Sequence, residues 1–243
     1  MNRRSFLKGL LFVSSIFTFK LKASKKNNIS FDFGIASGDP TNTNIILWTK
    51  VTPSLKKDIH INWQLSADKN FKNILNSGLV LAKYSNDFTV KVDVNVPNAF
   101  RGNKVFYRFL FNDTFSDTGI TNTLPQNNPD KYNIAFCSCS NHPAGYFNAY
   151  QEMAKNEDID LVLHLGDYIY EYDKNGYATE DSEQLNRVVE PKHEIISLND
   201  YRRRHAQYKS DLDLQELHKS KPMIAVWDDH EFANDSWLSL IHI

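Results

Sequence analysis

Three short segments in the second half of the chain carry side chains that could do chemistry. They are "FCSC", ending at Cys139, "LGD", ending at Asp167, and "DDHE", Asp228–Glu231. Each follows an apolar run typical of a buried strand. In open α/β sheets, ligands bind beyond the carboxyl ends of the strands, so we expect a thiol, a carboxylate and an acid–imidazole cluster at one edge. Because neighbouring carboxylates repel one another unless a cation neutralises them, these residue types indicate a metal site.

Each segment also has a simpler interpretation. A Gly-Asp pair after a strand is commonly only a turn, and the acids of "DDHE" could begin a helix, where they suit its dipole. Tyr168, Tyr170 and Tyr172 could simply pack, as aromatic residues at strand ends often do. His164 lies inside an apolar run and is interpreted as a core histidine rather than a ligand. It is the combination of the three segments that favours the metal site.

The elements that would position these segments follow an α/β pattern. Near-continuous apolar strands are predicted at 132–139, 160–167 and 222–231. Between the first two, "GYFNAYQEMAKNEDI" has helical spacing, and a longer helical region surrounds "LNDYRRRHAQYKSDLDLQELHKS". This alternation of strands and helices predicts a mostly parallel sheet with covered faces.

Residues 31–125 have a different, all-β pattern. Turn-forming residues separate the strands, and their spacing predicts a small immunoglobulin-like or fibronectin-like β-sandwich. "PQNNPDKY" is interpreted as a linker, so we expect an α+β protein of two domains, with an α/β domain at 132–243. Four segments alternate apolar with polar residues, namely Asn44–Val51, His60–Ser66, Asp87–Val96 and Lys104–Phe111.

Composition and charge restrict the class of partner. The 243 residues have a hydrophobic fraction of 41% and a formal net charge of −1, which is typical of a folded globular protein. A nucleic-acid partner is not expected, because such binding depends on neutralising several phosphates with lysine and arginine. The dense basic runs, Lys25–Lys26 and Arg202–Arg204, are short, and both are interpreted as solvated surface.

Residues 1–24 have the composition of an export signal. A basic head precedes an apolar run from Gly9 to Phe19, which is shorter than the roughly 20 residues of a membrane-spanning helix. "RRSFLK" resembles the bacterial twin-arginine signal, so we expect the twin-arginine export machinery as a partner and a periplasmic or extracellular location. An uncleaved anchor is the alternative, because the cleavage site at Ala23 is weak. After processing, no stable membrane span is expected.

Several longer motifs resemble one family, the alkaline phosphatase D (PhoD-like) family of calcineurin-like metallophosphoesterases. They are "FGIASGDPTNTNIILWTKVTP", "FCSCSN" followed by "GYFNAY", "HLGDYIYEY", "YRRRHAQYKSDLDLQELHKSKP" and "VWDDHEFAND". The resemblance extends over roughly residues 31–237. It implies a β-domain followed by the first part of a metallophosphoesterase domain, and an exported enzyme that hydrolyses phosphate monoesters or diesters with a ferric ion and calcium ions.

The resemblance also implies a metal-binding role for three residues. Cys139 matches the family's iron-binding thiolate, Asp167 the carboxylate that bridges the metals, and Tyr170 the phenolate on iron. Thiolate and phenolate are anionic donors that suit an oxidised iron. Carboxylate oxygens suit calcium, which prefers hard ligands. Zinc with manganese is the alternative metal pair.

Three residues of the last motif are matched to the same centre. Asp229 stands where related enzymes place a bridging asparagine, His230 where they place the histidine beside the phosphate, and Asn234 is a further candidate oxygen ligand. His230 is therefore the candidate catalytic residue, which would stabilise the leaving oxygen or the developing charge. The bound cations would neutralise the phosphate oxygens and orient the attacking water.

The chain has two cysteines, and the resemblance separates their roles. In an extended strand, Cys137 and Cys139 would share a face and could both bind one metal. A disulfide between them would be strained in so short a ring. Because only Cys139 matches the family's ligand, Cys137 is interpreted as a small buried side chain.

The final residues, "LSLIHI", do not continue the family pattern, and we interpret the chain as an N-terminal fragment. Such a fragment would expose an apolar face and an unpaired strand edge, and it would bind metal weakly and turn over little substrate alone. The alternative function is that of a non-catalytic exported surface protein with a vestigial enzyme domain. The residues do not distinguish monoester, phospholipid and teichoic-acid-like substrates, nor do they show the oligomeric state.

Overall fold

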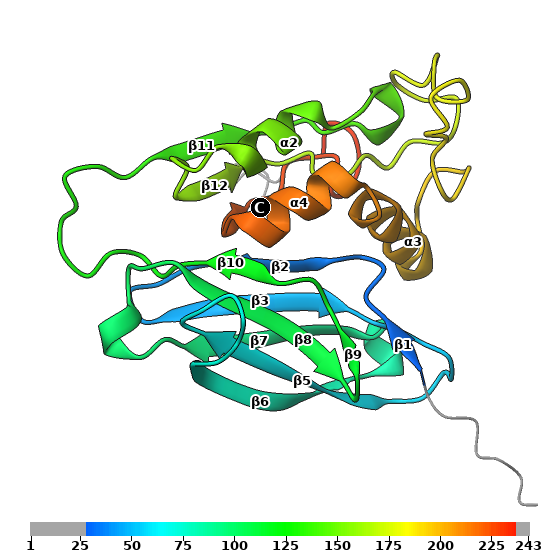
Figure 1. Cartoon of the computed structure of the whole chain (residues 1–243). Helices are drawn as coiled ribbons and strands as arrows, with labels where there is room; N and C mark the ends of the chain where they lie inside the picture. The colour runs from blue at the N-terminus through cyan, green and yellow to red at the C-terminus, as the bar shows by residue number, and fades with distance from the viewer. Residues whose placement is uncertain (1–27, 237–243) are drawn as a thin grey trace, which may run out of the picture.

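The computed structural model describes residues 28–236. Its strands form two larger β-sheets and a two-stranded ribbon, and the α-helices lie above the long strands in Figure 1. The predicted signal at 1–24 lies outside the described residues. One of the sheets is antiparallel, with the strand order β10-β8-β5-β6 and with β9 beside β8. Its strands are β5 (Ile59–Ser66), β6 (Ile74–Ala82), β8 (Val105–Phe111), β9 (Thr114–Phe115) and β10 (Gly119–Thr121).

The second sheet has six strands in the order β11-β12-β13-β2-β3-β7. The first three pair in parallel, as the sequence predicts, and β13 also pairs in parallel with β2 through Met223 and Gly38. Strands from both sides of the predicted linker at 125–132 therefore share one sheet. They are β2 (Ile35–Gly38), β3 (Asn44–Lys50), β7 (Thr89–Asn95), β11 (Ile134–Cys137), β12 (Leu161–His164) and β13 (Met223–Ala225).

Alternating apolar residues hold the antiparallel parts of the two sheets together. Along β3, every second side chain is buried, because successive side chains of a strand point to opposite faces. The four strands predicted in this region are all present, with their ends shifted by no more than two residues. A short ribbon of β1 (Ile29–Ser30) and β4 (Thr52–Pro53) lies beside them. The core between the sheets includes Ile45, Leu47, Ile61, Leu65, Val90, Val94, Val105 and Phe109.

Among residues 28–236, three α-helices lie in the upper part of Figure 1 together with β11 and β12. Side chains of these helices and of the parallel strands form the second hydrophobic core. The helices are α2 (Asn148–Lys155), α3 (Leu198–Lys209) and α4 (Leu212–Ser220). The predicted long helical region is divided between α3 and α4, because Asp211 leaves the helical conformation and caps the start of α4. Short 3₁₀ turns are η1 (Tyr84–Asn86), η2 (Asn98–Phe100) and η3 (His142–Ala144).

Two predictions about local structure are wrong. The parallel strands end earlier than predicted, at Cys137, His164 and Ala225, so the polar residues that follow lie in loops. Arg204 is not solvated surface but fully buried, and its guanidinium donates to the backbone carbonyl oxygen of Tyr170. Within residues 28–236, none of the helices has the length and apolar character that crossing a membrane requires.

Candidate metal centre

The loops after β11 and β12 stay paired beyond the ends of these strands. The Leu165 N–H donates to the Cys137 carbonyl at 2.8 Å, and the Ser140 N–H donates to the Asp167 carbonyl at 2.9 Å. The backbone pairing of the two chain segments therefore continues beyond the ends of β11 and β12 into the loops. As a result, Cys139 and Asp167 lie in neighbouring loops at the carboxyl edge of the sheet, where the sequence predicts them.

Close backbone approach shapes these loops. Gly166 has φ +108°, and a Cβ atom on it would lie 2.5 Å from Cβ of Asp228, in the loop after β13. Glycine is therefore required where the second and third loops meet. Cys139 and Asp167 also have positive φ, 56° and 53°. Non-glycine residues adopt this conformation infrequently, and such strain is concentrated at functional sites.

The three loops bring together one cluster that could hold a cation. Ligand atoms of Asp167, Asp229 and His230 all lie within 4.8 Å of one another. Asp167 is buried, whereas the other two are half-buried. The Oδ1 atom of Asp167 is buried and has no hydrogen-bond partner among residues 28–236. A buried carboxylate oxygen without a partner is costly, and a bound cation would satisfy it.

Tyr170 lies against the same carboxylate. Its hydroxyl donates to Oδ2 of Asp167 at 3.2 Å. Burial, followed by the negative charges of Asp167 and Cys139, raises the pKa of Tyr170 above its usual value. Without a cation the phenol therefore stays protonated at neutral pH, whereas an adjacent cation would favour the phenolate. Tyr170 thus lies beside Cys139 and Asp167, the two other residues to which the family resemblance gives a metal-binding role.

The two cysteines lie in different environments, and both thiols are free. Cys139 is exposed, whereas Cys137 is half-buried against the core beneath the helices. Burial raises the pKa of the Cys137 thiol to about 11, so this residue stays protonated at neutral pH. Because a thiolate is the metal-binding form, the environment of Cys137 suits a packing side chain.

His230 is oriented by a buried glutamate that sequence reasoning missed. Its Nδ1 atom donates to Oε2 of Glu171 at 2.9 Å, because a carboxylate at this position can only accept. Glu171 is 2% exposed, and its Oε1 accepts from the Asn234 N–H at 2.6 Å. The arrangement leaves Nε2 of His230 available for a ligand. Carboxylates commonly fix the tautomer and direction of functional histidines in this way.

Asn234 follows His230 in the same loop. Its side-chain Oδ1 accepts from the Tyr172 hydroxyl at 2.7 Å. An amide oxygen has two lone pairs, so one remains for a cation. The structure therefore places Asn234 beside the cluster with its oxygen partly used, and its role as a ligand stays a prediction.

Glu231 joins the second and third loops and was also missed. Its Oε2 accepts from the N–H groups of Asp167, at 3.0 Å, and Asp228, at 2.7 Å. Its Oε1 accepts from the N–H of Tyr168. The available signal was only its position within the "DDHE" motif, since nothing in the sequence shows which backbone groups it reaches.

Arg204, in α3, holds the loop that carries Tyr170 and Tyr172 through hydrogen bonds. The guanidinium donates to the carbonyl oxygens of both tyrosines, and the contact with Tyr172 measures 3.0 Å. Its remaining bonds are to the carbonyls of Glu190 and Pro191, at 3.2 and 3.0 Å. A charge buried in this way acts as a rigid support, because its donors are directed in a planar fork.

Known proteins match this chain over both of its parts. The family model described as PhoD-like phosphatase matches residues 134–241, and that of the PhoD-like phosphatase N-terminal domain matches residues 18–125. Alkaline phosphatase D of Bacillus subtilis (strain 168) is 38% identical over 238 residues, covering 93% of this chain and 40% of that protein.

A solved structure described as the structure of PhoD has the same arrangement. It matches with a TM-score of 0.74 and 37% identity, covering 84% of this chain and 40% of that one. The chain thus spans less than half the length of each of these relatives. Two family models that together match most of the chain, and the agreement in both sequence and fold, show that it belongs to the PhoD-like phosphatase family.

Proposed function

We propose that this chain is part of a metal-dependent phosphoesterase that hydrolyses phosphate monoesters or diesters. The observation that carries the proposal is the cluster of Asp167, Asp229 and His230, with a buried carboxylate oxygen that has no partner in the described residues. A cation there would provide the positive charge that phosphate recognition needs. The resemblance to alkaline phosphatase D supports the same class of reaction.

The donor atoms are compatible with a ferric ion beside calcium. Cys139, Tyr170 and Asp167 would hold the iron, while Asp167, Asp229 and Asn234 would supply oxygen ligands to calcium. When bound, such ions neutralise phosphate oxygens and lower the pKa of water.

The residues of this chain have distinct parts in the proposed reaction. His230 presents Nε2 to the substrate and would donate a proton to the leaving oxygen or a hydrogen bond to the phosphate. Glu171 accepts from its Nδ1, which holds the ring in one orientation. The Glu231 contacts keep the loops of Asp167 and Asp228 at a fixed separation, so that the donors need little reorganisation.

The proposal extends to architecture and location. Residues 31–125 would form the immunoglobulin-like β-sandwich, and 132–243 the first part of a metallophosphoesterase domain. The facing sheets and the parallel strands β11, β12 and β13 support this division. Residues 1–24 would direct twin-arginine export to the periplasm or the extracellular space, as the "RRSFLK" motif suggests.

Metal analysis of two matched variants, made in the full-length, export-matured protein that contains this chain, tests the function. We expect Cys139→Ala to lower the bound iron at least tenfold and to reduce hydrolysis of p-nitrophenyl phosphate in parallel, because a thiolate ligand is lost. Cys137→Ala should retain both. Zinc with manganese in the unaltered protein would replace the assignment of metals. Absence of bound metal would contradict the enzyme and favour a non-catalytic surface protein.

A further inference from the structure

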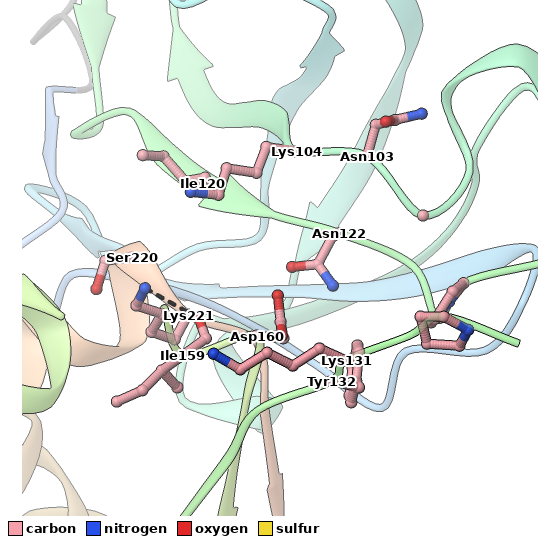
Figure 2. A pocket seen from close by; sticks show the side chains of 13 residues that line it. Asn103, Lys104, Ile120, Asn122, Lys131, Tyr132, Ile159, Asp160, Ser220 and Lys221 are labelled. Atoms are coloured by element: carbon pink, nitrogen blue, oxygen red, sulfur yellow. Dashed lines mark hydrogen bonds between the residues drawn. The ribbon is translucent and has the colours of Figure 1, made fainter. Parts of the chain in front are cut away.

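A polar pocket lies at the amino ends of the parallel strands, whereas the candidate metal centre lies beyond their carboxyl ends (Figure 2). Its volume is about 320 Å³. Tyr132, Asp160 and Lys221 line it and come shortly before β11, β12 and β13, whereas the metal-centre residues follow these strands. The pocket is therefore separate from the proposed active site.

Its walls come from both sides of the predicted linker. Lys104 and Asn122 belong to the β-rich half of the chain, and Lys131 to the segment that leads into β11. The turn at Gly102 is fixed against the residues that follow β10, since its N–H donates to the Thr123 hydroxyl at 2.6 Å. Figure 2 shows these side chains around the pocket. A ligand bound here would contact segments distant in the sequence.

Positive charge predominates in the pocket. Three lysines line it, Lys104, Lys131 and Lys221, against one carboxylate, Asp160. One oxygen of Asp160 already accepts from the Asn133 N–H at 2.8 Å. The lining thus carries a net charge of +2, in a protein whose overall net charge is −1.

One of the three lysines is buried, since only 6% of Lys221 is exposed. Its Nζ donates to the carbonyls of Asn156, at 2.7 Å, and Ile159, at 3.0 Å, which uses two of its three donors. No carboxylate lies within ion-pair distance of it among residues 28–236. Burial, followed by the charge of Lys104, lowers the pKa of Lys221. The charges of Asp160, Glu157 and Asp158 offset this burial only in part, and an anion in the pocket would compensate the ammonium further.

One further polar group of the pocket is unsatisfied. The Tyr132 hydroxyl is buried and has no hydrogen-bond partner in the described part of the chain. The pocket also offers the side-chain amides of Asn103 and Asn122, whereas the Ser220 hydroxyl already donates to the Glu216 carbonyl at 2.7 Å. From these contacts we propose that the pocket binds a small dianionic oxyanion, with the charge of Lys104, Lys131 and Lys221 neutralising it. A single phosphate group and a pair of carboxylates share this chemistry.

Calorimetric titration of the full chain tests the proposal. Sodium sulfate and sodium succinate are the probes, each at an ionic strength matched with sodium chloride. We expect saturable binding with one site per chain for at least one of the two anions. Stronger binding of sulfate would indicate a tetrahedral headgroup, and stronger binding of succinate two carboxylates. Absence of saturable binding for both would overturn the proposal.

Matched variants assign the binding to the pocket. Lys131→Gln and Lys104→Gln each remove one exposed ammonium and should weaken binding about tenfold, as expected for the loss of one charge-assisted contact. Lys57→Gln removes an exposed lysine elsewhere and should have no effect. Cys139→Ala should also have none, because it alters only the candidate metal centre. Equal losses in Lys57→Gln, or a loss in Cys139→Ala alone, would contradict the assignment.

Discussion

At the scale of single residues, the candidate site depends on side chains whose orientation is fixed by hydrogen bonds. One ring nitrogen of His230 donates a hydrogen bond to one carboxylate oxygen of Glu171. The other oxygen of Glu171 accepts from the backbone N–H of Asn234. Glu171 therefore acts through His230 and is a positioning residue. The family-like motif contains it, but only the structure shows that it reaches a histidine 59 residues later.

Glu171→Gln should separate positioning from folding. The amide keeps the size of the side chain, but its oxygen is a weaker acceptor than the carboxylate for the Nδ1–H of His230. We expect kcat of the full-length protein to fall about 10–100-fold, because the imidazole is no longer held in one orientation. KM and far-UV circular dichroism should change little. Glu180→Gln, at an exposed position, is the control. An unchanged kcat, or a rise in KM without a loss of kcat, would argue against the role of Glu171.

His164 carries a pH-dependent contribution to stability. Burial lowers its pKa to about 4, from an ordinary value near 6.5. Between these values the unfolded chain binds a proton that the folded chain does not, so stability falls as the pH falls from 6.5 toward 4. The loss should approach about 3 kcal/mol per buried neutral histidine, at about 1.4 kcal/mol per pH unit. Urea unfolding at pH 7.5, 6 and 5, in chelator, measures it.

The control for this prediction is His164→Asn, which removes the titrating group. The variant should start from a lower stability at pH 7.5, because the bond to the Tyr150 hydroxyl is lost, but its stability should then depend less on pH. His142, whose pKa burial also lowers to about 4, should preserve part of the slope. A slope identical to that of the unaltered chain would contradict the assignment to His164.

At the scale of elements, the sequence predicted strands where apolar and polar residues alternate. β3 is such a case, with burial at every second residue. β6 was not predicted, because its side chains are mostly partly exposed and follow no regular alternation. The third parallel strand was predicted too long: Val226 and Trp227 read as strand, yet they are 52% and 83% exposed in the loop.

The candidate site also has a predictable and an unpredictable part. The placement of Cys139, Asp167 and Asp229 at one edge of the sheet was predictable, because parallel strands bring their carboxyl ends together whatever the details of the loops. The contacts of Glu171 and Glu231 depend on loop conformations such as the positive φ of Asp167. Such conformations are set by contacts between loops, which no local pattern of residue types encodes.

Asp211 shows how one residue can join two elements. Its Oδ1 caps α4 by accepting from the N–H groups of Asp213 and Leu214, at 3.0 and 3.1 Å. Its Oδ2 pairs with Arg187 at 2.7 Å, and both side chains are less than one tenth exposed. Asp211→Ala should therefore destabilise the chain by about 3–5 kcal/mol, because it leaves a buried guanidinium unpaired.

Ser197→Ala is the comparison variant for Asp211→Ala, and urea denaturation measures the free energy of unfolding of both. Ser197 caps α3 in the same manner but has no buried ion pair, so its loss should cost only about 1 kcal/mol. Comparable losses in the two variants would show that the Arg187 contact contributes little beyond the cap.

At the scale of the whole molecule, the six-stranded sheet is covered unevenly. α2, α4 and the second core lie on one face of β11, β12 and β13, where Val162 is fully buried. On the alternate positions of β11, Ile134 and Phe136 are 41% and 65% exposed, and β11 is an edge strand. Among the described residues, β11 therefore presents exposed apolar side chains on a strand with one unpaired edge.

Phe136→Lys should reduce the exposed apolar surface without a loss of folding stability. We expect weaker binding of a hydrophobic dye and slower aggregation, because a charge on an edge strand opposes pairing between chains. The free energy of unfolding should change by no more than about 0.5 kcal/mol, as at other surface positions. Leu79→Lys replaces an exposed leucine on the other sheet, 60% exposed, and should affect the dye less. Destabilisation of the size caused by a core substitution would instead show that the β11 face belongs to a packed interior in solution.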